Sequence, residues 1–270
     1  MYQNIEVKKI ENNKIVVINI NRPQKRNCVN SETAQELLKA FQDFDNDPQA
    51  LIAIFASKDG IFCAGFDLME ASQIMHPSKI QEMFPLHFQS KAPMGISRYL
   101  TKKPVIGSIE GFAVAGGLEL SLWCDMVVSN RQCVFGVFCR RFGVPLIDGG
   151  TVRLQRVIGF NRAKDMVLTG REVKGQEAYE WGLVNRLCSD NESVLEKSIE
   201  LCKEIIRNPQ YCMQLDRQSL YENTFINFDQ QIQTEFHRGS LAILKGETSQ
   251  GASNFVNNKA GRGGKPLPKL

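Results

Sequence analysis

The chain has 270 residues, of which 43% are hydrophobic and 23% are charged, and its formal net charge is +4. This composition is typical of a soluble globular protein that buries one sizeable core. Basic residues form no dense run and are not interleaved with aromatic residues, so we expect no nucleic acid partner. No apolar stretch reaches the length of a bilayer, so we predict no membrane span.

The eight cysteines are scattered along the sequence without a C-x-x-C pair. Several stand inside apolar runs, where a reduced cysteine packs as a small hydrophobic residue. This pattern predicts free thiols and a reducing intracellular compartment.

The C-terminal tripeptide Pro268-Lys269-Leu270 resembles the S-K-L peroxisomal signal, with proline in place of serine. A peroxisomal address and a flexible tail are both open interpretations, because glycines precede the tripeptide. Without the address, the mitochondrion and the cytoplasm are the alternative locations.

Alternating strands and helices are predicted from the first residues onward. Residues 14–20 (KIVVINI) are rich in β-branched side chains and predict a strand that ends at Asn21-Arg22-Pro23. Ser31 is the predicted cap of a helix whose apolar residues repeat every 3.6 positions as far as Asp47-Pro48. Residues 51–56 (LIAIFA) predict a buried strand, and this strand–helix–strand order favours a parallel sheet.

The same order recurs further along the chain. Strands are expected over 104–109, 126–128 and 183–187, and helices over 118–123, 149–158 and 176–181. After Ser193 the strand signals stop, and apolar residues at helical spacing predict a mostly helical C-terminal third. We therefore predict an α/β core over residues 1–193 and a helical extension over residues 194–270.

Two segments place small residues where an apolar strand gives way to a helix. They are residues 62–68 (FCAGFDL) and residues 111–120 (GFAVAGGLEL). Glycine lets a backbone approach a ligand closely, and free N–H groups in the first turn of a helix favour negative charge. Either segment alone is typical of a close-packed strand–helix turn, but two such segments can aim two amides at one oxygen.

Together, and in this order, the two segments resemble the enoyl-CoA hydratase/isomerase (crotonase) superfamily. The resemblance covers nearly the whole chain and includes further motifs at residues 21–27, 124–125, 135–136, 140–145, 148–151, 168–170 and 178–184. It implies a crotonase-like ββα spiral core with a helical C-terminal region that covers neighbouring sites. It also implies an acyl-CoA substrate, a role in fatty acid metabolism, and a homotrimer or dimer of trimers.

The resemblance further implies an oxyanion hole formed by the backbone amides of Phe66 and Gly116. These two amides would bind the thioester oxygen as negative charge develops on it. The neighbouring residues Ala64, Asp67 and Leu68, together with Phe66, are predicted to contact the CoA substrate.

Other parts of the substrate are assigned to two further regions. Lys25 and Arg26 are predicted partners of the CoA phosphates. Residues 69–99, which are rich in Met, Phe and Ile, are either an enclosure for the acyl group or ordinary core. No cofactor beyond the CoA moiety is expected, and no metal, because His76, His87 and His237 lack metal-ligand spacing.

Carboxylates at the site are the candidates for proton transfer. By resemblance, Glu119 matches the first catalytic glutamate of family hydratases, whereas the position of the second falls on Cys139, for which packing is favoured. Asp148 matches an aspartate that transfers protons in dienoyl-CoA isomerases and acts as nucleophile in chlorobenzoyl-CoA dehalogenase. The alternative for Asp148 is an N-cap on the following helix. Glu119 and Asp148 form a predicted pair, one protonated to donate and one ionised to accept.

Hydration of a 2-enoyl-CoA and isomerisation of its double bond are the leading predicted reactions, which makes the chain a lyase or an isomerase. Decarboxylation or C–C cleavage of a CoA thioester is an alternative, because it also passes through an enolate. A non-catalytic CoA-binding scaffold subunit is a second alternative, motivated by the missing second glutamate.

Overall fold

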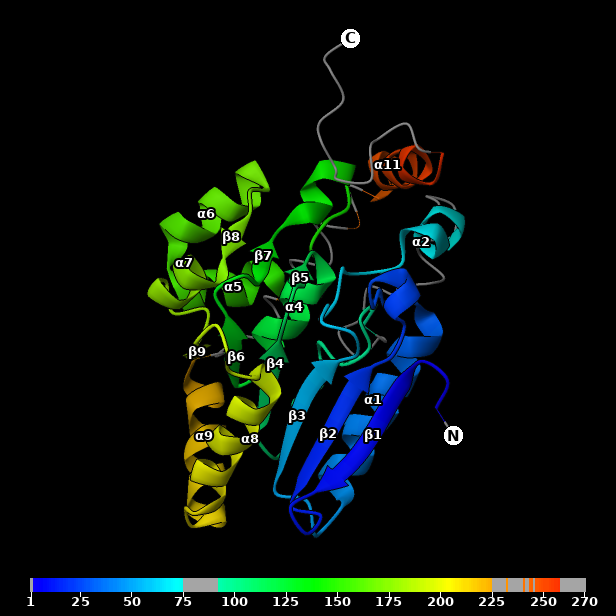
Figure 1. Cartoon of the computed structure of the whole chain (residues 1–270). Helices are drawn as coiled ribbons and strands as arrows, with labels where there is room; N and C mark the ends of the chain where they lie inside the picture. The colour runs from blue at the N-terminus through cyan, green and yellow to red at the C-terminus, as the bar shows by residue number, and fades with distance from the viewer. Residues whose placement is uncertain are drawn as a thin grey trace.

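A mixed sheet runs through the computed structural model, which describes residues 2–74, 92–224, 232, 240, 243, 244 and 246–257. Within these residues its six strands have the order β1-β2-β3-β4-β6-β9 (Figure 1). The strands are β1 (Ile5–Ile10), β2 (Ile15–Ile20), β3 (Ile52–Ser57), β4 (Val105–Ile109), β6 (Met126–Asn130) and β9 (Arg186–Cys188). β1 is antiparallel to β2, and each later pair of neighbours is parallel.

Both faces of this sheet are covered by helices. Every residue of β2 is buried, as expected for a strand between two covering layers. Alternate residues of β2 belong to two hydrophobic clusters. One cluster includes Phe41 of α1 (Ser31–Asn46), and the other includes Leu201 of α8 (Val194–Ile206).

A second, smaller sheet has three strands in the described residues. It has the order β5-β7-β8, with strands β5 (Phe112–Val114), β7 (Val134–Gly136) and β8 (Val173–Lys174). Helix α4 (Gly116–Trp123) begins two residues after β5, and the 3-10 helix η2 (Phe138–Phe142) begins two residues after β7. Because β5 and β7 are parallel neighbours, their chain exits lie at the same edge of the sheet.

The remaining elements surround these two sheets. They are η1 (Pro23–Lys25), α2 (Leu68–Ile74), α5 (Gly150–Ile158), α6 (Phe160–Thr169), α7 (Gly175–Glu180), α9 (Gln210–Thr224) and α11 (Glu247–Val256). Helix α11 contacts both α2 and η2, and Figure 1 shows α2 and α11 close together at the upper right.

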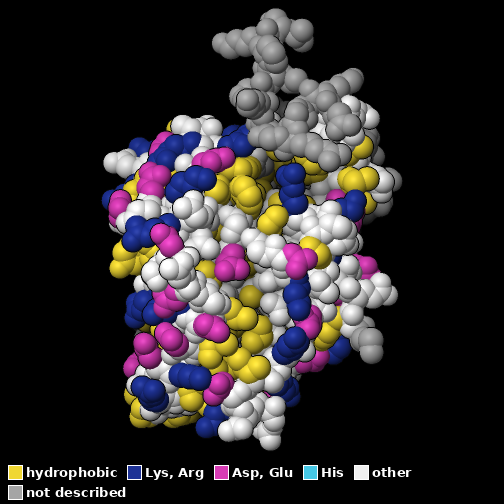
Figure 2. Space-filling view, viewed as in Figure 1, with side chains coloured by type: hydrophobic (Ala, Val, Ile, Leu, Met, Phe, Trp, Pro, Cys, Tyr) yellow, Lys and Arg dark blue, Asp and Glu magenta, His cyan; other side chains and the backbone are white. Residues whose placement is uncertain are grey.

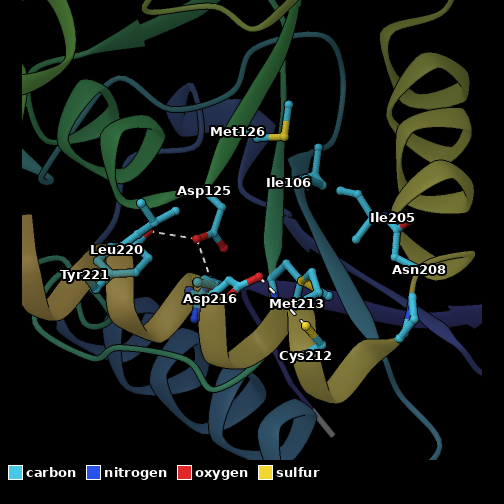
Figure 3. Close-up of a pocket in the computed structure, with 13 residues that line it drawn as sticks. Ile106, Asp125, Met126, Ile205, Asn208, Cys212, Met213, Asp216, Leu220 and Tyr221 are labelled. Atoms are coloured by element: carbon cyan, nitrogen blue, oxygen red, sulfur yellow. Dashed lines mark hydrogen bonds and ion pairs between the residues drawn. The ribbon is translucent and has the colours of Figure 1, made fainter.

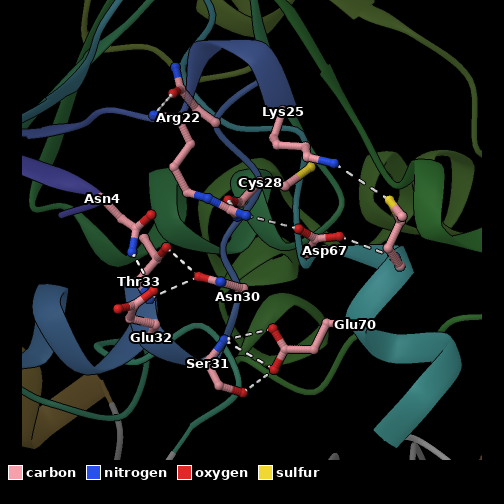
Figure 4. Close-up of polar contacts among 12 residues, drawn as sticks. Asn4, Arg22, Lys25, Cys28, Asn30, Ser31, Glu32, Thr33, Asp67 and Glu70 are labelled. Carbon is pink, nitrogen blue, oxygen red and sulfur yellow. Dashed lines mark hydrogen bonds and ion pairs between the residues drawn. The ribbon is translucent and has the colours of Figure 1, made fainter.

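The predicted α/β class and parallel pairing are confirmed, whereas one predicted helix cap is wrong. Asn30, not Ser31, caps α1, because its side-chain oxygen accepts a hydrogen bond from Thr33 N at 2.9 Å (Figure 4). Ser31 is the first helical residue, and its hydroxyl donates to Glu70 instead. Strand β1 was not predicted.

The surface carries both signs of charge, and acidic and basic side chains are interspersed over the face shown in Figure 2. All eight cysteines are free, as predicted. In the described part of the chain, no helix combines the length and apolar composition that crossing a bilayer requires. The tripeptide Pro268-Lys269-Leu270 lies outside the described residues.

Candidate active site

A cavity of about 80 Å³ lies where the segments that follow β3, β5 and β7 meet. We call it the site cavity. Its lining consists of Ala64, Phe66, Leu68, Pro93, Met94, Ala115, Gly116, Glu119, Phe138, Cys139, Phe142, Val144, Pro145, Ile147, Asp148 and Ile243. The wall is therefore mostly apolar, and two carboxyl groups, those of Glu119 and Asp148, face it.

Hydrogen bonds on both sides hold the loop that contains Phe66. Cys63 N donates to Phe112 O at 2.9 Å, and Cys63 O accepts from Val114 N at 3.1 Å. On the other side, Val29 N donates to Gly65 O at 2.9 Å, and Val29 O accepts from Asp67 N at 2.8 Å. The amide of Phe66 lies between these fixed points, and it donates to no acceptor within the described residues.

The same loop packs directly against the start of α4. A Cβ added to Gly65, whose φ is +104°, would lie 3.1 Å from Gly116 N, and one added to Gly117 would lie 2.1 Å from Cys63 O. Side chains at these two positions would force the segments apart. Gly116 is the first residue of α4, where N–H groups lack a partner inside the helix. Its amide donates to no acceptor in the described part of the chain.

Ala115 makes the turn into α4 with φ +54° and ψ −125°. Positive φ is uncommon for a residue with a Cβ, and holding such a conformation costs on the order of 1–3 kcal/mol. Ala115 N donates to Gly136 O at 2.9 Å, which ties the turn to the end of β7. Backbone strain is thus present immediately before the Gly116 amide.

Glu119 lies in the first turn of α4, and only 3% of its surface is exposed. Its Oε1 accepts hydrogen bonds from Asp148 N at 2.9 Å and from Gly150 N at 2.8 Å. A Cβ on Gly150 would lie 2.9 Å from this oxygen, so the approach requires glycine. Two backbone N–H groups, one just before α5 and one at its first residue, therefore hold this carboxylate oxygen.

Asp148 is also only 3% exposed, and its side chain makes no capping hydrogen bond to helix α5. Oδ1 accepts from Met94 N at 3.1 Å and from the hydroxyl of Ser97. The N-cap alternative for Asp148 is wrong, because Gly149 occupies the N-cap position and no side chain caps α5. Burial raises the pKa of Asp148, although Arg98, Ser97 and Met94 N oppose the shift.

Cys139 lines the site cavity from η2. Burial, together with the nearby charge of Glu119, raises the pKa of the Cys139 thiol to about 12. The thiol is therefore neutral at neutral pH and cannot replace a carboxylate in proton transfer.

The predicted CoA-phosphate residues lie beside the Phe66 loop. Lys25 and Arg26 are both exposed, and Arg26 O accepts a hydrogen bond from Ala64 N at 3.1 Å. Lys25 Nζ lies 3.5 Å from Met69 Sδ in α2 (Figure 4). Two cationic side chains thus stand at the surface next to a loop that lines the site cavity.

Asp67 has a different environment from its neighbours in the sequence. Its Oδ2 lies 3.1 Å from Arg22 Nη2, and its Oδ1 accepts from Met69 N at 3.1 Å (Figure 4). The carboxylate is held by Arg22 and by the first turn of α2. Ala64 and Leu68 line the site cavity, whereas Asp67 is not among the described residues that do.

Met94, Ser97 and Arg153 surround Asp148. Met94 and Ser97 were predicted only as members of the 69–99 segment, and Arg153 was not predicted. Of the predicted acyl enclosure, residues 75–91 lie outside the described residues, as do His76, His87 and His237. Pro93 and Met94, near the end of that enclosure, do line the site cavity. No sequence pattern links this segment to residue 148, because the contacts join loops about 50 residues apart.

A largely parallel sheet with an antiparallel first strand, whose chain exits meet at a cavity with two carboxyl groups, agrees with the crotonase-class α/β enzyme that the sequence predicts. Comparison with known proteins gives the family. Residues 10–260 match the family model described as enoyl-CoA hydratase/isomerase, and the chain belongs to this family.

Named relatives come from fungi, plants, bacteria and mammals. The probable peroxisomal enoyl-CoA hydratase 1 of Arabidopsis thaliana is 32% identical over 98% of this chain and 97% of its own length. The mevalonyl-coenzyme A hydratase sidH of Aspergillus fumigatus is 31% identical over 72% of this chain and 70% of its own length.

Among solved structures, EchA1_1 from Mycobacterium paratuberculosis has a TM-score of 0.81 at 25% identity and covers 98% of both chains. A carnitinyl-CoA dehydratase from Mycobacterium avium has a TM-score of 0.79 at 26% identity, again over 98% of both chains. The crotonase-like fold predicted from the sequence is confirmed.

Proposed function

We propose that the site cavity binds the thioester group of a 2-enoyl-CoA and stabilises it as an enolate. The thioester oxygen accepts hydrogen bonds from Phe66 N and Gly116 N. The observation that carries this proposal is that both amides belong to residues lining one cavity and donate to no acceptor in the described residues. Losing one such donor lowers kcat on the order of 100–1,000-fold.

Proton transfer is proposed for the two carboxyl groups, in opposite protonation states. Two backbone N–H donors favour ionised Glu119, and burial favours protonated Asp148. In hydration, Glu119 accepts a proton from water as the water oxygen bonds to the β-carbon and the C=C π bond breaks. The electrons move to the thioester oxygen, and Asp148 then donates its proton to the α-carbon. Proton return from Glu119 to Asp148 completes the net addition of water.

Isomerisation of the double bond is the second candidate reaction, and Cys139 favours it. The neutral thiol stands where the resemblance gives hydratases a second glutamate. A double-bond shift needs no activated water. It needs one group to remove a proton at one carbon and one group to return a proton at another, and Glu119 and Asp148 meet this requirement.

The proposal also covers CoA binding, the C-terminal region and the assembly. Lys25 and Arg26 bind CoA phosphates, supported by their exposed positions beside Ala64. The CoA moiety of the substrate is the sole cofactor. Residues 194–270 are the C-terminal region, whose first helix, α8, packs on one face of the sheet, and the assembly is a homotrimer or dimer of trimers in a reducing compartment.

Turnover of crotonyl-CoA tests the proposal. The purified protein is expected to consume the enoyl absorbance and form 3-hydroxybutyryl-CoA, whereas 3-butenoyl-CoA would gain that absorbance if the enzyme isomerises it. Glu119→Gln preserves the side-chain oxygen but removes the base, and we expect kcat to fall on the order of 100–10,000-fold.

The matched control is Glu196→Gln, since Glu196 also lies in the first turn of a helix but is exposed. Wild-type kcat in the Glu119→Gln variant would contradict the proposal. CoA-thioester binding without turnover of either substrate would favour the scaffold alternative.

A further inference from the structure

Arg153 and Ser97 form a buried polar link behind Asp148. Arg153 belongs to α5 and is 8% exposed, and Ser97 is fully buried at 0% exposure. Arg153 Nη1 donates to Asp148 O at 3.0 Å, and Nη2 donates to Ser97 O at 2.6 Å. One guanidinium group thus joins two segments that are more than 50 residues apart in the sequence.

Ser97 also contacts the carboxyl group of Asp148 directly. Its hydroxyl donates to Asp148 Oδ1, which also accepts from Met94 N at 3.1 Å. Asp148 is therefore attached to the loop that carries Met94 and Ser97 by its side chain, and through Arg153 by its backbone. Oδ2 accepts no hydrogen bond within the described residues, so it is the oxygen available for proton transfer.

The turn sequence Asp148-Gly149-Gly150 is adapted to this arrangement. Gly149 has φ +97°, and a Cβ added to it would lie 2.0 Å from Arg153 Nη1. The first glycine therefore makes room for the Arg153 guanidinium, whereas the second makes room for the Glu119 carboxylate. Both proposed proton-transfer groups depend on the same short turn.

Charges around Asp148 come from three described residues. The cations of Arg98 and Arg153 both lower the pKa of Asp148, against the larger effect of burial. Arg98 also donates to Ile147 O at 3.1 Å, next to Asp148 in the chain. Glu119 is the acidic neighbour, since it accepts from Asp148 N at 2.9 Å.

We propose that Arg153 is a positioning residue for the reaction. It fastens the Asp148 turn to the Ser97 loop and so holds the Asp148 carboxyl group in the orientation that proton transfer in the site cavity requires. This inference rests on the proposed function of Asp148.

Two substitutions at Arg153 separate its charge from its geometry. Arg153→Met keeps an unbranched apolar stem and removes the guanidinium group, so both the charge and the two hydrogen bonds are lost. We expect kcat to fall about 100-fold, the size of effect known for a small misplacement of a reacting group. KM should stay unchanged. The limb of the pH–rate profile that reports the protonation of Asp148 should move to higher pH, because a cation that stabilises the carboxylate is lost.

Arg153→Lys retains the cation but cannot donate to both carbonyl oxygens in the fork geometry of arginine. Its pH limb is expected to stay near the wild-type position while kcat remains reduced. Arg156→Met is the matched control, because Arg156 lies one turn further along α5, is exposed and donates to Val152 O of the same helix. Its kcat and pH profile should equal those of the wild type.

If Arg153→Met fails to fold, Ser97→Ala still tests the link between the Ser97 loop and Asp148. It removes one hydroxyl group and leaves the Arg153 hydrogen bonds to both carbonyl oxygens. It should move the same pH limb to higher pH. Wild-type kcat and pH profiles in the folded variants would overturn the inference, as would a fall in kcat that follows lower thermal stability without a moved limb. Asp148→Asn distinguishes the two proposals, because full activity there refutes the proposed function itself.

Discussion

Two cavities of the molecule differ in volume and in whether their polar groups are hydrogen-bonded within the protein. The larger, of about 780 Å³, lies between α9, the end of α8 and strands β4 and β6, and we call it the α9 groove (Figure 3). It is lined by Pro104, Ile106, Asp125, Met126, Ile205, Asn208, Pro209, Cys212, Met213, Asp216, Arg217, Leu220 and Tyr221. The site cavity has about 80 Å³.

Polar groups of the α9 groove mainly bind one another. Asp125 Oδ1 accepts from Arg217 Nε at 2.7 Å and from Tyr221 OH at 2.8 Å, and its Oδ2 accepts from Val105 N at 2.7 Å. Arg217 Nη1 donates to Thr101 O at 2.7 Å. These bonds fasten α9 to the rest of the fold and occupy the Asp125 carboxylate and the Arg217 guanidinium group with partners inside the protein.

The site cavity shows the opposite pattern. Phe66 N and Gly116 N have no acceptor in the described residues, and strain at Ala115 stands beside them. Buried polar groups are normally paired, so unpaired donors on residues that line one cavity indicate a ligand site better than volume does. Hydrogen-bonding capacity therefore distinguishes the α9 groove from the cavity that we propose to be catalytic.

Asp148→Asn should have the largest effect, and this effect should be a fall in kcat in a protein that still folds. Asparagine can still accept from Met94 N and Ser97, but it cannot donate an acidic proton, so kcat is expected to fall on the order of 100–10,000-fold. Steady-state kinetics on the substrate identified for the wild type checks this. Undiminished activity would remove Asp148 from the mechanism.

The same variant should be more stable than the wild type at neutral pH. Burial raises the folded-state pKa of Asp148 above its unfolded value, so stability is present below the unfolded pKa and is lost as pH rises through the folded pKa. Asparagine does not ionise and avoids this loss. Urea unfolding should show a difference between the two proteins that is small in acid and grows toward neutral pH.

Asp125→Asn, in the α9 groove, should show the reverse behaviour. It weakens charge-assisted hydrogen bonds to Arg217 and Tyr221 and should lower the free energy of unfolding by about 1.5–3 kcal/mol. Kinetic constants per folded molecule should match the wild type. A fall in kcat without a loss of stability would show that the two cavities are not functionally separate.

The residues around the Phe66 and Gly116 amides could be predicted because glycine-rich strand–helix turns are a local pattern. Asp148 was assigned from the family resemblance, since its residue type alone also fitted a helix cap, and its environment was not predicted. The donors to its carboxyl group come from Met94 and Ser97, and such long-range contacts leave no periodic signal in a single sequence. Arg153 was missed for the same reason.

The N-cap of α1 was predicted wrongly because two adjacent polar residues can both fill that position. Asn30 and Ser31 are both good helix caps, and the contact of Ser31 with Glu70 of α2 accompanies the choice of Asn30. Strand β1 was missed because its centre is exposed and carries Lys8 and Lys9. It is an edge strand that pairs only with β2 in the described sheet, so it lacks the apolar run of its neighbours.

Ala115→Gly should have the smallest effect and tests whether strain is concentrated at the site cavity. Glycine adopts φ +54° without a Cβ penalty, and relief of the strain should exceed the entropy that glycine loses on folding. We expect the free energy of unfolding to rise by about 1 kcal/mol, measured by urea denaturation, with kcat changed little. A matched Ala163→Gly change in α6, where Ala163 is buried in regular helix, should instead lower stability by about 1 kcal/mol. If both variants lose the same free energy of unfolding, Ala115 is not strained. The site cavity and the α9 groove would then differ in unpaired donors but not in backbone strain.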